Sequence, residues 1–110
     1  MDQSNHQKNI REAQDVLGIS SNEVAGMLGV DPPELAKWMD SGVPEKDQAD
    51  VDRLRCLVEL LSREIDQSRL PDVVRRRDVW LGNRTMLEVI KRDGIAPMRQ
   101  YLTLVFAFRE

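Results

Sequence analysis

The segment from Ser21 to Asp40 constrains the fold of this chain more than any other part of the sequence. Two short helices that cross closely need a small residue at their contact, and the turn between them needs a residue that tolerates positive φ. Ala25 supplies the small side chain, and Gly29, four positions later, supplies the turn. The apolar residues that would face inward from both helices are Val24, Leu28, Val30, Leu35 and Trp38. This pattern predicts a helix-turn-helix.

The rest of the chain also predicts helices, because glycines, prolines and capping residues divide it into segments and period-two alternation is nearly absent. We therefore expect an all-α fold. A flexible polar leader is expected over residues 1–9, followed by a helix-turn-helix region over residues 10–45. Within that region Gly18 can end a first helix, and Ser20 and Glu23 form the capping box that opens the next one.

Local signals also bound the third helix and the long helix after it. Asp31 can cap the third helix, with Pro32 at its first position and Gly42 just beyond its end. A long connecting helix is expected over residues 46–67. Its apolar residues repeat with three-four spacing and form a seam of Val51, Leu54, Val58, Leu61 and Ile65. Such a seam fits either the core of the domain or the interface of a dimer.

Residues 70–110 are expected to form a short C-terminal helical module. Pro71 can begin a short helix that runs through Trp80, and the pair Gly82 and Asn83 then predicts a turn. Trp80 fits two roles, a plug between the last helices or an interface residue.

Two further helices are predicted after this turn. Thr85 and Glu88 form a second capping box, and Pro97 begins the final helix. Its apolar face would consist of Met98, Tyr101, Leu102, Val105 and Phe108. The aromatic side chains of this helix either pack on the long helix of the same chain or serve as interface anchors. Phe106 lies off the apolar face and is therefore expected to point toward a partner.

Charge is distributed unevenly along the chain. Residues 1–50 carry four basic and ten acidic side chains, a net charge of −6, whereas residues 51–110 carry twelve basic and nine acidic side chains, a net charge of +3. DNA binding depends on the neutralisation of phosphates by basic side chains. The first half of the chain, which contains the helix-turn-helix, therefore lacks the basic patch that a DNA-binding domain needs.

The second helix of the predicted motif is unusual for a helix that reads DNA. Its start would face the major groove, yet it offers three acidic residues and one lysine, which are Asp31, Glu34, Asp40 and Lys37. This helix is either a weak reader or a scaffold. The residues that we expect to contact DNA, if DNA is bound, are Ser21, Asn22, Pro33, Lys37 and Arg53. The run Arg75, Arg76 and Arg77 fits either phosphate contacts or a solvated face.

The sequence does not predict an enzyme, a cofactor or a metal site. Its one histidine, His6, falls in the polar leader, and its one cysteine, Cys56, falls in the apolar repeat of the long helix. Catalysis near neutral pH usually draws on such groups in pairs or clusters. The sequence contains no apolar run of about 18 residues, so it predicts no membrane span. The polar N-terminus and the unpaired cysteine are typical of a cytoplasmic protein.

The segment from Trp80 onward reads WLGNRTMLEVIKRDGIAPMRQYLTLVFAF. The features of this segment follow in a fixed order. A tryptophan comes first and a glycine turn second, and Arg-Thr then precedes a short helix that contains Leu-Glu. A glycine separates this helix from a final apolar helix. With the helix-turn-helix upstream, this order resembles the Xre/MbcA/ParS-type antitoxins over about residues 10–108. The residues that carry the resemblance are Trp80, Leu81, Gly82, Arg84, Thr85, Leu87, Glu88, Gly94, Leu102 and Val105.

This resemblance implies a function in a type II toxin–antitoxin system. The usual partner in that family is a RES-domain toxin that consumes NAD, and the C-terminal part of the antitoxin blocks its active site. Such antitoxins typically form homodimers and bind their own promoter. The residues that we expect to bind the partner are Trp80, Arg84, Thr85, Arg99, Tyr101, Phe106 and Phe108.

Three functions are therefore open at the level of the sequence. The first is an antitoxin that also represses its own operon. The second is a stand-alone transcription regulator whose C-terminal helices only dimerise it. The third is a protein-interaction module that retains the helix-turn-helix as architecture alone, which the net charge of −6 on residues 1–50 favours.

Overall fold

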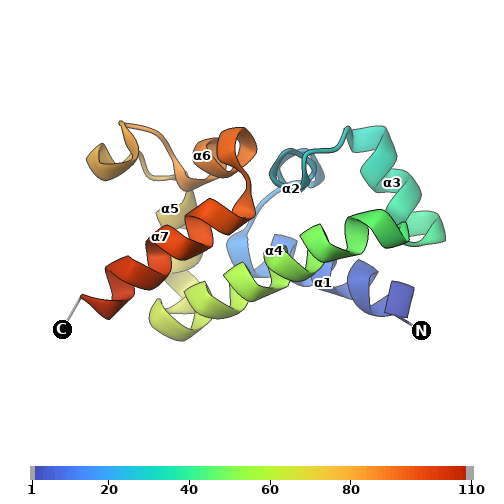
Figure 1. Cartoon of the computed structure of the whole chain (residues 1–110), viewed down its shortest axis with the longest axis horizontal. Coiled ribbons are helices and arrows are strands. Elements are labelled where there is room, and N and C mark those ends of the chain that lie inside the picture. Colours follow the sequence, from blue (N-terminus) through green and yellow to red (C-terminus); the bar gives the residue numbers. More distant parts are fainter. Residues whose placement is uncertain (1, 109–110) are drawn as a thin grey trace.

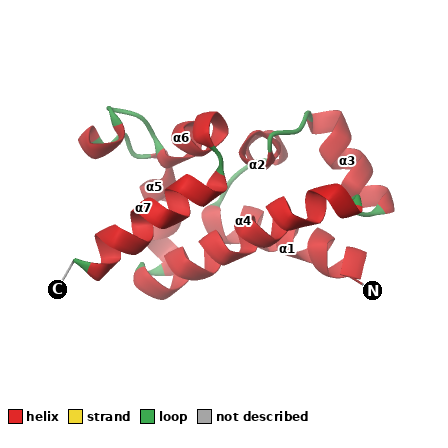
Figure 2. Cartoon of the chain, viewed as in Figure 1, coloured by secondary structure: helices red, strands yellow, loops and turns green. Residues whose placement is uncertain are grey.

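The computed structural model describes residues 2–108, with side chains from Asn5 onward. Met1, which is the first residue of the predicted leader, and Arg109 and Glu110, the last two residues of the predicted C-terminal module, lie outside the described residues. Within the described part, seven α-helices and two short 3₁₀ turns occur and no strand does, which confirms the predicted all-α fold (Figure 2). The elements are α1 (Asp2–Leu17), α2 (Ser21–Leu28), α3 (Pro32–Ser41), α4 (Glu45–Glu64), η1 (Gln67–Arg69), α5 (Leu70–Arg75), η2 (Val79–Leu81), α6 (Met86–Asp93) and α7 (Ile95–Ala107).

The long helix α4 crosses the middle of the molecule, and the other helices pack around it (Figure 1). α1 and α7 both pack against α4, and α2 packs against both α3 and α6. The contact between α2 and α6 joins the helix-turn-helix region to the C-terminal helices. Buried side chains from both regions form one hydrophobic cluster.

The apolar seam of α4 lies inside this cluster. Val51, Leu54 and Leu61 are fully buried and Val58 is nearly so, because α1 and α7 of the same chain cover them. The seam therefore forms the core of the chain and does not present a free surface for a dimer. The helix ends at Glu64, earlier than expected, so Ile65 packs half-buried against the core from beyond the helix end.

α1 already begins at Asp2, so the first helix starts within the predicted leader of residues 1–9. His6 is buried, and the side-chain amide of Gln7 donates hydrogen bonds to the carbonyl oxygens of Trp38 at 2.8 Å and Met39 at 3.2 Å. Residues 2–9 lack an apolar stripe, and polar side chains tie this helix to α3 instead. The contacts span more than 30 residues of sequence and so escape a local reading.

α2 and α3 form the two helices of the predicted helix-turn-helix. Ser20 and Glu23 form the capping box of α2, and Ala25 is fully buried in α2. Gly29 has a φ of 73°, in the left-handed region where glycine is unstrained. One expectation differs: Asp31 occupies the N-cap position of α3, but its side chain makes no capping hydrogen bond.

The C-terminal half departs from the expected helix between Pro71 and Trp80. α5 ends at Arg75, and Trp80 lies instead in the 3₁₀ turn η2. The turn ends with Gly82 and Asn83, both at positive φ, as expected. The capping box of Thr85 and Glu88 opens α6, which confirms that prediction. α7 begins at Ile95, two residues before the expected start. None of the helices in the described part combines the length and the apolarity that a membrane span requires.

Candidate functional site

The large apolar side chains that remain exposed gather on η2 and on the end of α7. Trp80 is 82% exposed and Phe108, the C-cap residue of α7, is 85% exposed. The others are Val79, Leu104 and Val105. Figure 1 shows η2 and the C-terminal end of α7 at the same end of the molecule. Exposed apolar patches on a small protein often mark a surface that binds a partner, so these two groups of residues are the candidates for such a surface.

Trp80 is held outward by the backbone of its own loop. Its N–H donates a hydrogen bond of 2.9 Å to the carboxylate Oδ1 of Asp78. The carbonyl oxygen of Asp78 accepts from the N–H of Leu81 at 3.0 Å and of Asn83 at 2.9 Å, and the N–H of Asp78 donates to the Arg84 carbonyl at 3.1 Å. These bonds close residues 78–84 into a compact loop, with η2 at its tip.

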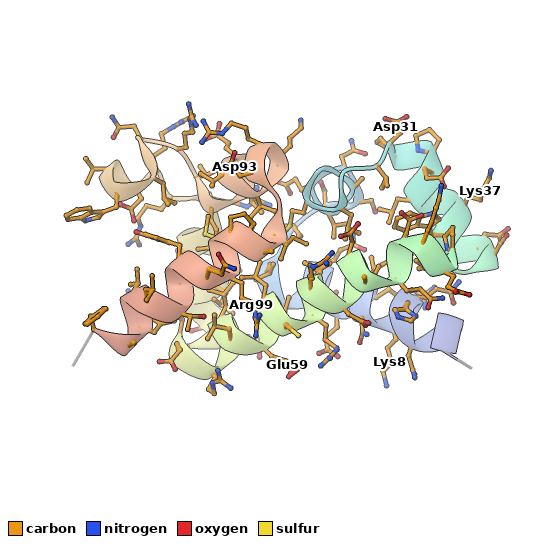
Figure 3. All side chains as sticks on the ribbon, in the orientation of Figure 1. Lys8, Asp31, Lys37, Glu59, Asp93 and Arg99 are labelled. Carbon is orange, nitrogen blue, oxygen red and sulfur yellow. The ribbon has the colours of Figure 1, made fainter. Side chains whose placement is uncertain are left out.

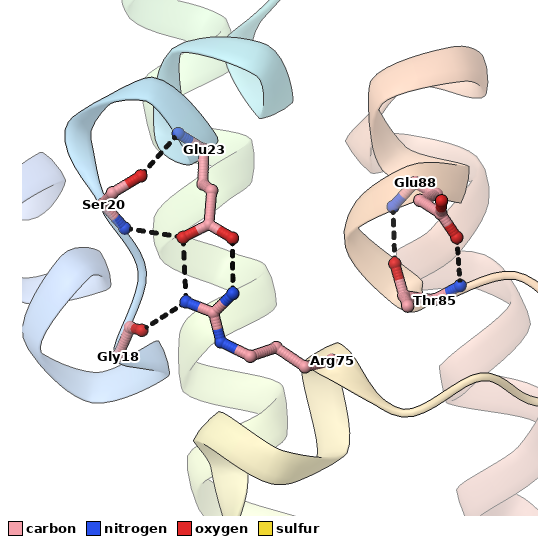
Figure 4. A network of polar contacts seen from close by, with 6 residues as sticks. All are labelled: Gly18, Ser20, Glu23, Arg75, Thr85 and Glu88. Carbon is pink, nitrogen blue, oxygen red and sulfur yellow. Dashed lines mark hydrogen bonds and ion pairs between the residues drawn. The ribbon is translucent and has the colours of Figure 1, made fainter.

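The base of this loop is fixed to α6. One guanidinium nitrogen of Arg77 lies 2.9 Å from the carbonyl oxygen of Asn83 and 3.3 Å from Oε1 of Glu88. The same Oε1 accepts from the N–H of Thr85 at 2.8 Å, within the capping box drawn in Figure 4. The Thr85 hydrogen bond, and then the charge of Arg77, lower the pKa of Glu88. Glu88 therefore stays ionised and secures the loop to the start of α6.

The residues predicted to bind a partner differ in their exposure. Trp80 is exposed, so the interpretation of Trp80 as a core plug is wrong. Arg84, Arg99 and Phe108 are also exposed, whereas Thr85, Tyr101 and Phe106 are half-buried. Phe106 was expected to point outward but packs against the core, and Phe108 and Leu104 are exposed instead.

Two exposed residues of this surface, Val79 and Leu104, were not predicted from the sequence. Leu104 lies off the helical stripe of Met98, Leu102 and Val105, and a large apolar residue off the buried stripe of a helix is a usable signal. Val79 adjoins Trp80 in a segment too short for any periodic pattern, so no comparable signal exists for it.

Two hollows lie beside the exposed residues. The first has a volume of about 150 Å³ and is lined largely by Ile65, Val73, Leu81, Met86, Tyr101 and Phe106. The second, of about 290 Å³, is lined in part by Trp80, Leu81, Val89, Pro97 and Tyr101. Leu81 and Tyr101 line both hollows, so the surface combines a projecting tryptophan with apolar recesses large enough for a side chain.

The arginine run after α5 does not act as one unit. The guanidinium of Arg75 binds both carboxylate oxygens of Glu23, at 2.5 and 2.8 Å, and the carbonyl oxygen of Gly18 at 2.8 Å (Figure 4). These contacts join α5 to the start of α2. With Arg77 held at the loop base, Arg76 is the member of the run without an ion pair or side-chain hydrogen bond within the described residues.

The carboxylate of Glu23 serves the capping box and the ion pair at once. It accepts the N–H of Ser20 at 2.8 Å while it binds Arg75. The hydrogen bonds from Arg75, and then the bond from the Ser20 backbone, lower the pKa of Glu23. The ionised form of Glu23 therefore links the helix-turn-helix to the C-terminal half.

The predicted DNA contacts occupy different surroundings. Ser21, Asn22, Pro33 and Lys37 are all exposed, and Figure 3 shows Lys37 and Asp31 on α3 at the end of the molecule opposite the end of α7. Arg53 lies on α4 and pairs with Asp50 at 2.7 Å.

The acidic residues of α3 do not all face outward. Glu34 is half-buried and accepts a hydrogen bond of 3.0 Å from the indole Nε1 of Trp38, so it supports the packing of the helix. Asp31 and Asp40 remain exposed beside Lys37. The exposed surface of this helix thus stays acidic with two carboxylates against one lysine.

The two side chains considered as catalytic groups, His6 and Cys56, do not belong to the exposed apolar surface of η2 and α7. His6 is buried between α1 and α4, with Nε2 3.4 Å from Oδ1 of Asp52, and it lines a polar hollow of about 620 Å³. Cys56 is half-buried, less enclosed than the core position expected for it. Among the side chains that the structure describes, no group of three or more histidine, cysteine, aspartate or glutamate residues could hold a metal ion.

Comparison with known proteins finds no family model that matches the chain. No curated protein matches it either. Among solved structures, the chain is similar to one from the crystal structure of the M. tuberculosis MbcT-MbcA toxin-antitoxin complex, with a TM-score of 0.65. The identity is 13%, and the likeness covers 88% of this chain and 89% of the other. The likeness is one of fold, and it extends over nearly the whole of both chains.

Proposed function

We propose that this chain is the antitoxin of a type II toxin–antitoxin system and neutralises its toxin by direct binding. The observation that carries the proposal is the likeness of fold to a chain of a toxin–antitoxin complex, over 88% of the described chain's length. The exposed apolar surface of η2 and α7 supports it, because a monomer in water gains nothing from leaving such side chains uncovered.

The toxin in this proposal is a RES-domain protein that consumes NAD, as the sequence resemblance implies. It acts in the cytoplasm, where the antitoxin covers its active site. The exposed contact residues are Trp80, Arg84, Arg99 and Phe108, which can reach a partner directly. Tyr101 and Phe106 line a hollow that can receive a partner side chain, and Thr85 shapes the loop through its capping box.

The test is to express the product of the reading frame adjacent to this gene, alone and together with the chain. The proposal predicts that the neighbour alone arrests growth and depletes cellular NAD. Co-expression restores growth, and the two proteins co-purify. A control is the variant Trp38→Ala, whose loss of core packing should weaken protection by destabilising the antitoxin. If the neighbouring product is harmless, or remains toxic beside abundant folded wild-type chain, the proposal is wrong.

Repression of its own operon is the second part of the proposal. The helix-turn-helix supports it, and Ser21, Asn22, Pro33 and Lys37 are exposed for contact with an operator. We expect DNA binding mainly in complex with toxin or as a homodimer, because the exposed carboxylates of α3 oppose phosphates. Gel shifts on the chain's own promoter, with and without toxin at low salt, test this part, and light scattering gives the oligomeric state. A stand-alone regulator would instead bind without any partner.

The acidic surface of α3 favours a second candidate function, a protein-interaction module without DNA binding. Asp31 and Asp40 are exposed, and Lys37 is the one lysine of this helix. The double variant Asp31→Ala/Asp40→Ala separates the two functions. A helix that approaches DNA should bind more tightly once these carboxylates are removed, whereas an architectural helix should leave the promoter unbound in every variant.

A further inference from the structure

We propose that the loop of residues 76–84 is a preformed anchor, whose Trp80 inserts into an apolar pocket rimmed by carboxylates on the partner protein. This inference rests on the proposed function, since the partner is the toxin. It adds the chemistry of the toxin's surface and the part of the antitoxin that reads it.

The first step is the shape of the loop, which is fixed before any partner arrives. Five backbone-donated hydrogen bonds hold residues 78–84, and Arg77 fastens the loop to Glu88. A loop that is already ordered loses little conformational entropy on binding, so more of the contact energy appears as affinity. The neighbouring side chain Leu81 turns inward to line both hollows, and Trp80 borders the second one. Val79 and Trp80 are nevertheless 73% and 82% exposed.

The second step is the size of the side chain that projects. Tryptophan is among the residue types most enriched at the positions that dominate the binding energy of interfaces. Such residues contribute this energy when they lie in desolvated pockets. An exposed tryptophan on a rigid turn therefore needs a recess on the partner. The hollow of about 290 Å³ beside Trp80 offers the partner a reciprocal recess, because Leu81, Val89 and Tyr101 line it.

The third step is charge, which decides the partner's class. Arg76 and Arg84 flank the loop tip, are exposed, and pair with no acid among residues 5–108. Asp78, the one acid of residues 76–84, is occupied by the N–H of Trp80. Helix α7 contributes Arg99 as its single charged residue. Asp93, which borders the second hollow, pairs with Arg92 at 3.0 Å. The charges of the loop and of α7 that have no acidic partner are thus cations, which match carboxylates on a partner.

The same charges argue against a second copy of this chain as the occupant. In a two-fold interface the same patch meets itself, so arginines of one copy would lie against arginines of the other. Juxtaposed like charges oppose association. The aliphatic members of the surface, Val79, Leu104 and Val105, have no role in stacking on nucleobases. A protein pocket accounts for both the rigid shape and the mixed composition.

The test measures binding of purified variants to the product of the adjacent reading frame by titration calorimetry at low and high salt. Trp80→Ala is expected to weaken binding by about thirty-fold or more, and Trp80→Phe by much less. The double reversal Arg76→Glu/Arg84→Glu should weaken binding and remove or invert its dependence on salt. Lys46→Glu, an exposed reversal at the start of α4, should bind as the wild type does. Thermal unfolding of each variant should match the wild type, because all four sites are exposed.

The outcomes separate this inference from the proposed function. If the wild type binds and protects but Trp80→Ala and the double reversal bind equally well, the anchor is refuted and the antitoxin function stands. If the wild type does not bind its neighbour, both are refuted. The anchor is also refuted if Trp80→Ala abolishes a homodimer of the free chain. Loss of binding to phosphatidylglycerol vesicles or single-stranded RNA, with toxin binding intact, would refute it too.

Discussion

The two tryptophans of this chain provide a sharp test of which residues hold the fold and which serve a surface. Trp38 is 1% exposed, whereas Trp80 is 82% exposed. A tryptophan buries roughly 200 Å², which at roughly 25 cal/mol per Å² corresponds to about 5 kcal/mol as an upper bound. We expect Trp38→Ala to lower the free energy of unfolding by about 4 kcal/mol, in the range of about 3–5 kcal/mol typical for such cavities. Trp80→Ala should change it by less than about 0.5 kcal/mol.

The loss at Trp38 is a large share of the total stability. A chain of this size is stable by only about 5–15 kcal/mol, so Trp38→Ala is expected to remain folded in water but to unfold at a much lower urea concentration. The variant also removes the indole N–H that Glu34 accepts. Urea unfolding followed by far-ultraviolet circular dichroism suits both variants, because this signal does not depend on tryptophan emission.

Fluorescence gives an independent control for the same prediction. Trp80→Phe leaves Trp38 as the sole emitter, which should resist quenching by acrylamide, and Trp38→Phe leaves a tryptophan that is quenched readily. The reasoning is refuted if Trp80→Ala destabilises the chain as much as Trp38→Ala does, or if the two single-tryptophan variants are quenched alike.

Three further predictions concern single positions. Because Arg75 lowers the pKa of Glu23, the ionised carboxylate adds stability above its ordinary pKa of 4.5, and that stability is lost as pH falls through the lower folded value. Thermal unfolding of Glu23→Gln from pH 7 to 3 should therefore show a weaker dependence on pH in this acid range than the wild type does. Equal slopes for the two proteins would contradict the prediction. Gly29→Ala should lower the free energy of unfolding by about 1 kcal/mol through its φ of 73° alone, since no atom lies within 4 Å of a new Cβ. Gly29→Asn should lower it by less, which the urea midpoints of the two variants will show. An equal loss for both variants would argue against backbone strain. Ser20→Ala should lower the free energy of unfolding by about 1 kcal/mol, because it removes the cap of α2. Urea unfolding measures this loss, and an unchanged midpoint would show that the cap is dispensable.

The elements that could be predicted are those that local chemistry determines. The capping boxes at Ser20 and Thr85 and the left-handed Gly29 depend on residues within a few positions, and the structure has them where expected. The start of α1 within residues 1–9 was not predicted, because His6 and Gln7 contact residues more than 30 positions away. No periodic pattern in the sequence predicts such polar contacts.

The surface was harder to predict than the fold. Phe106 lies in α7 and Phe108 is the C-cap residue of the same helix, and only the packing of α7 on the rest of the chain decides that Phe106 is covered and Phe108 is not. The pair of Arg75 and Glu23 spans 52 residues, so its members seemed unrelated in the sequence. The exposure of Trp80 follows from the early end of α5 and from the Asp78 cap, since a continuous helix would have placed it elsewhere.

The most direct test of the central claim is the NAD-consuming activity of the adjacent gene's product in the presence of this chain. The purified neighbour is mixed with NAD and with increasing amounts of wild-type chain, and the remaining NAD is measured. We predict that NAD consumption falls to zero near a stoichiometric amount of antitoxin, and that Trp80→Ala requires a large excess. NAD consumption that continues unchanged beside excess folded wild-type chain, or a neighbour that does not consume NAD, would contradict the account.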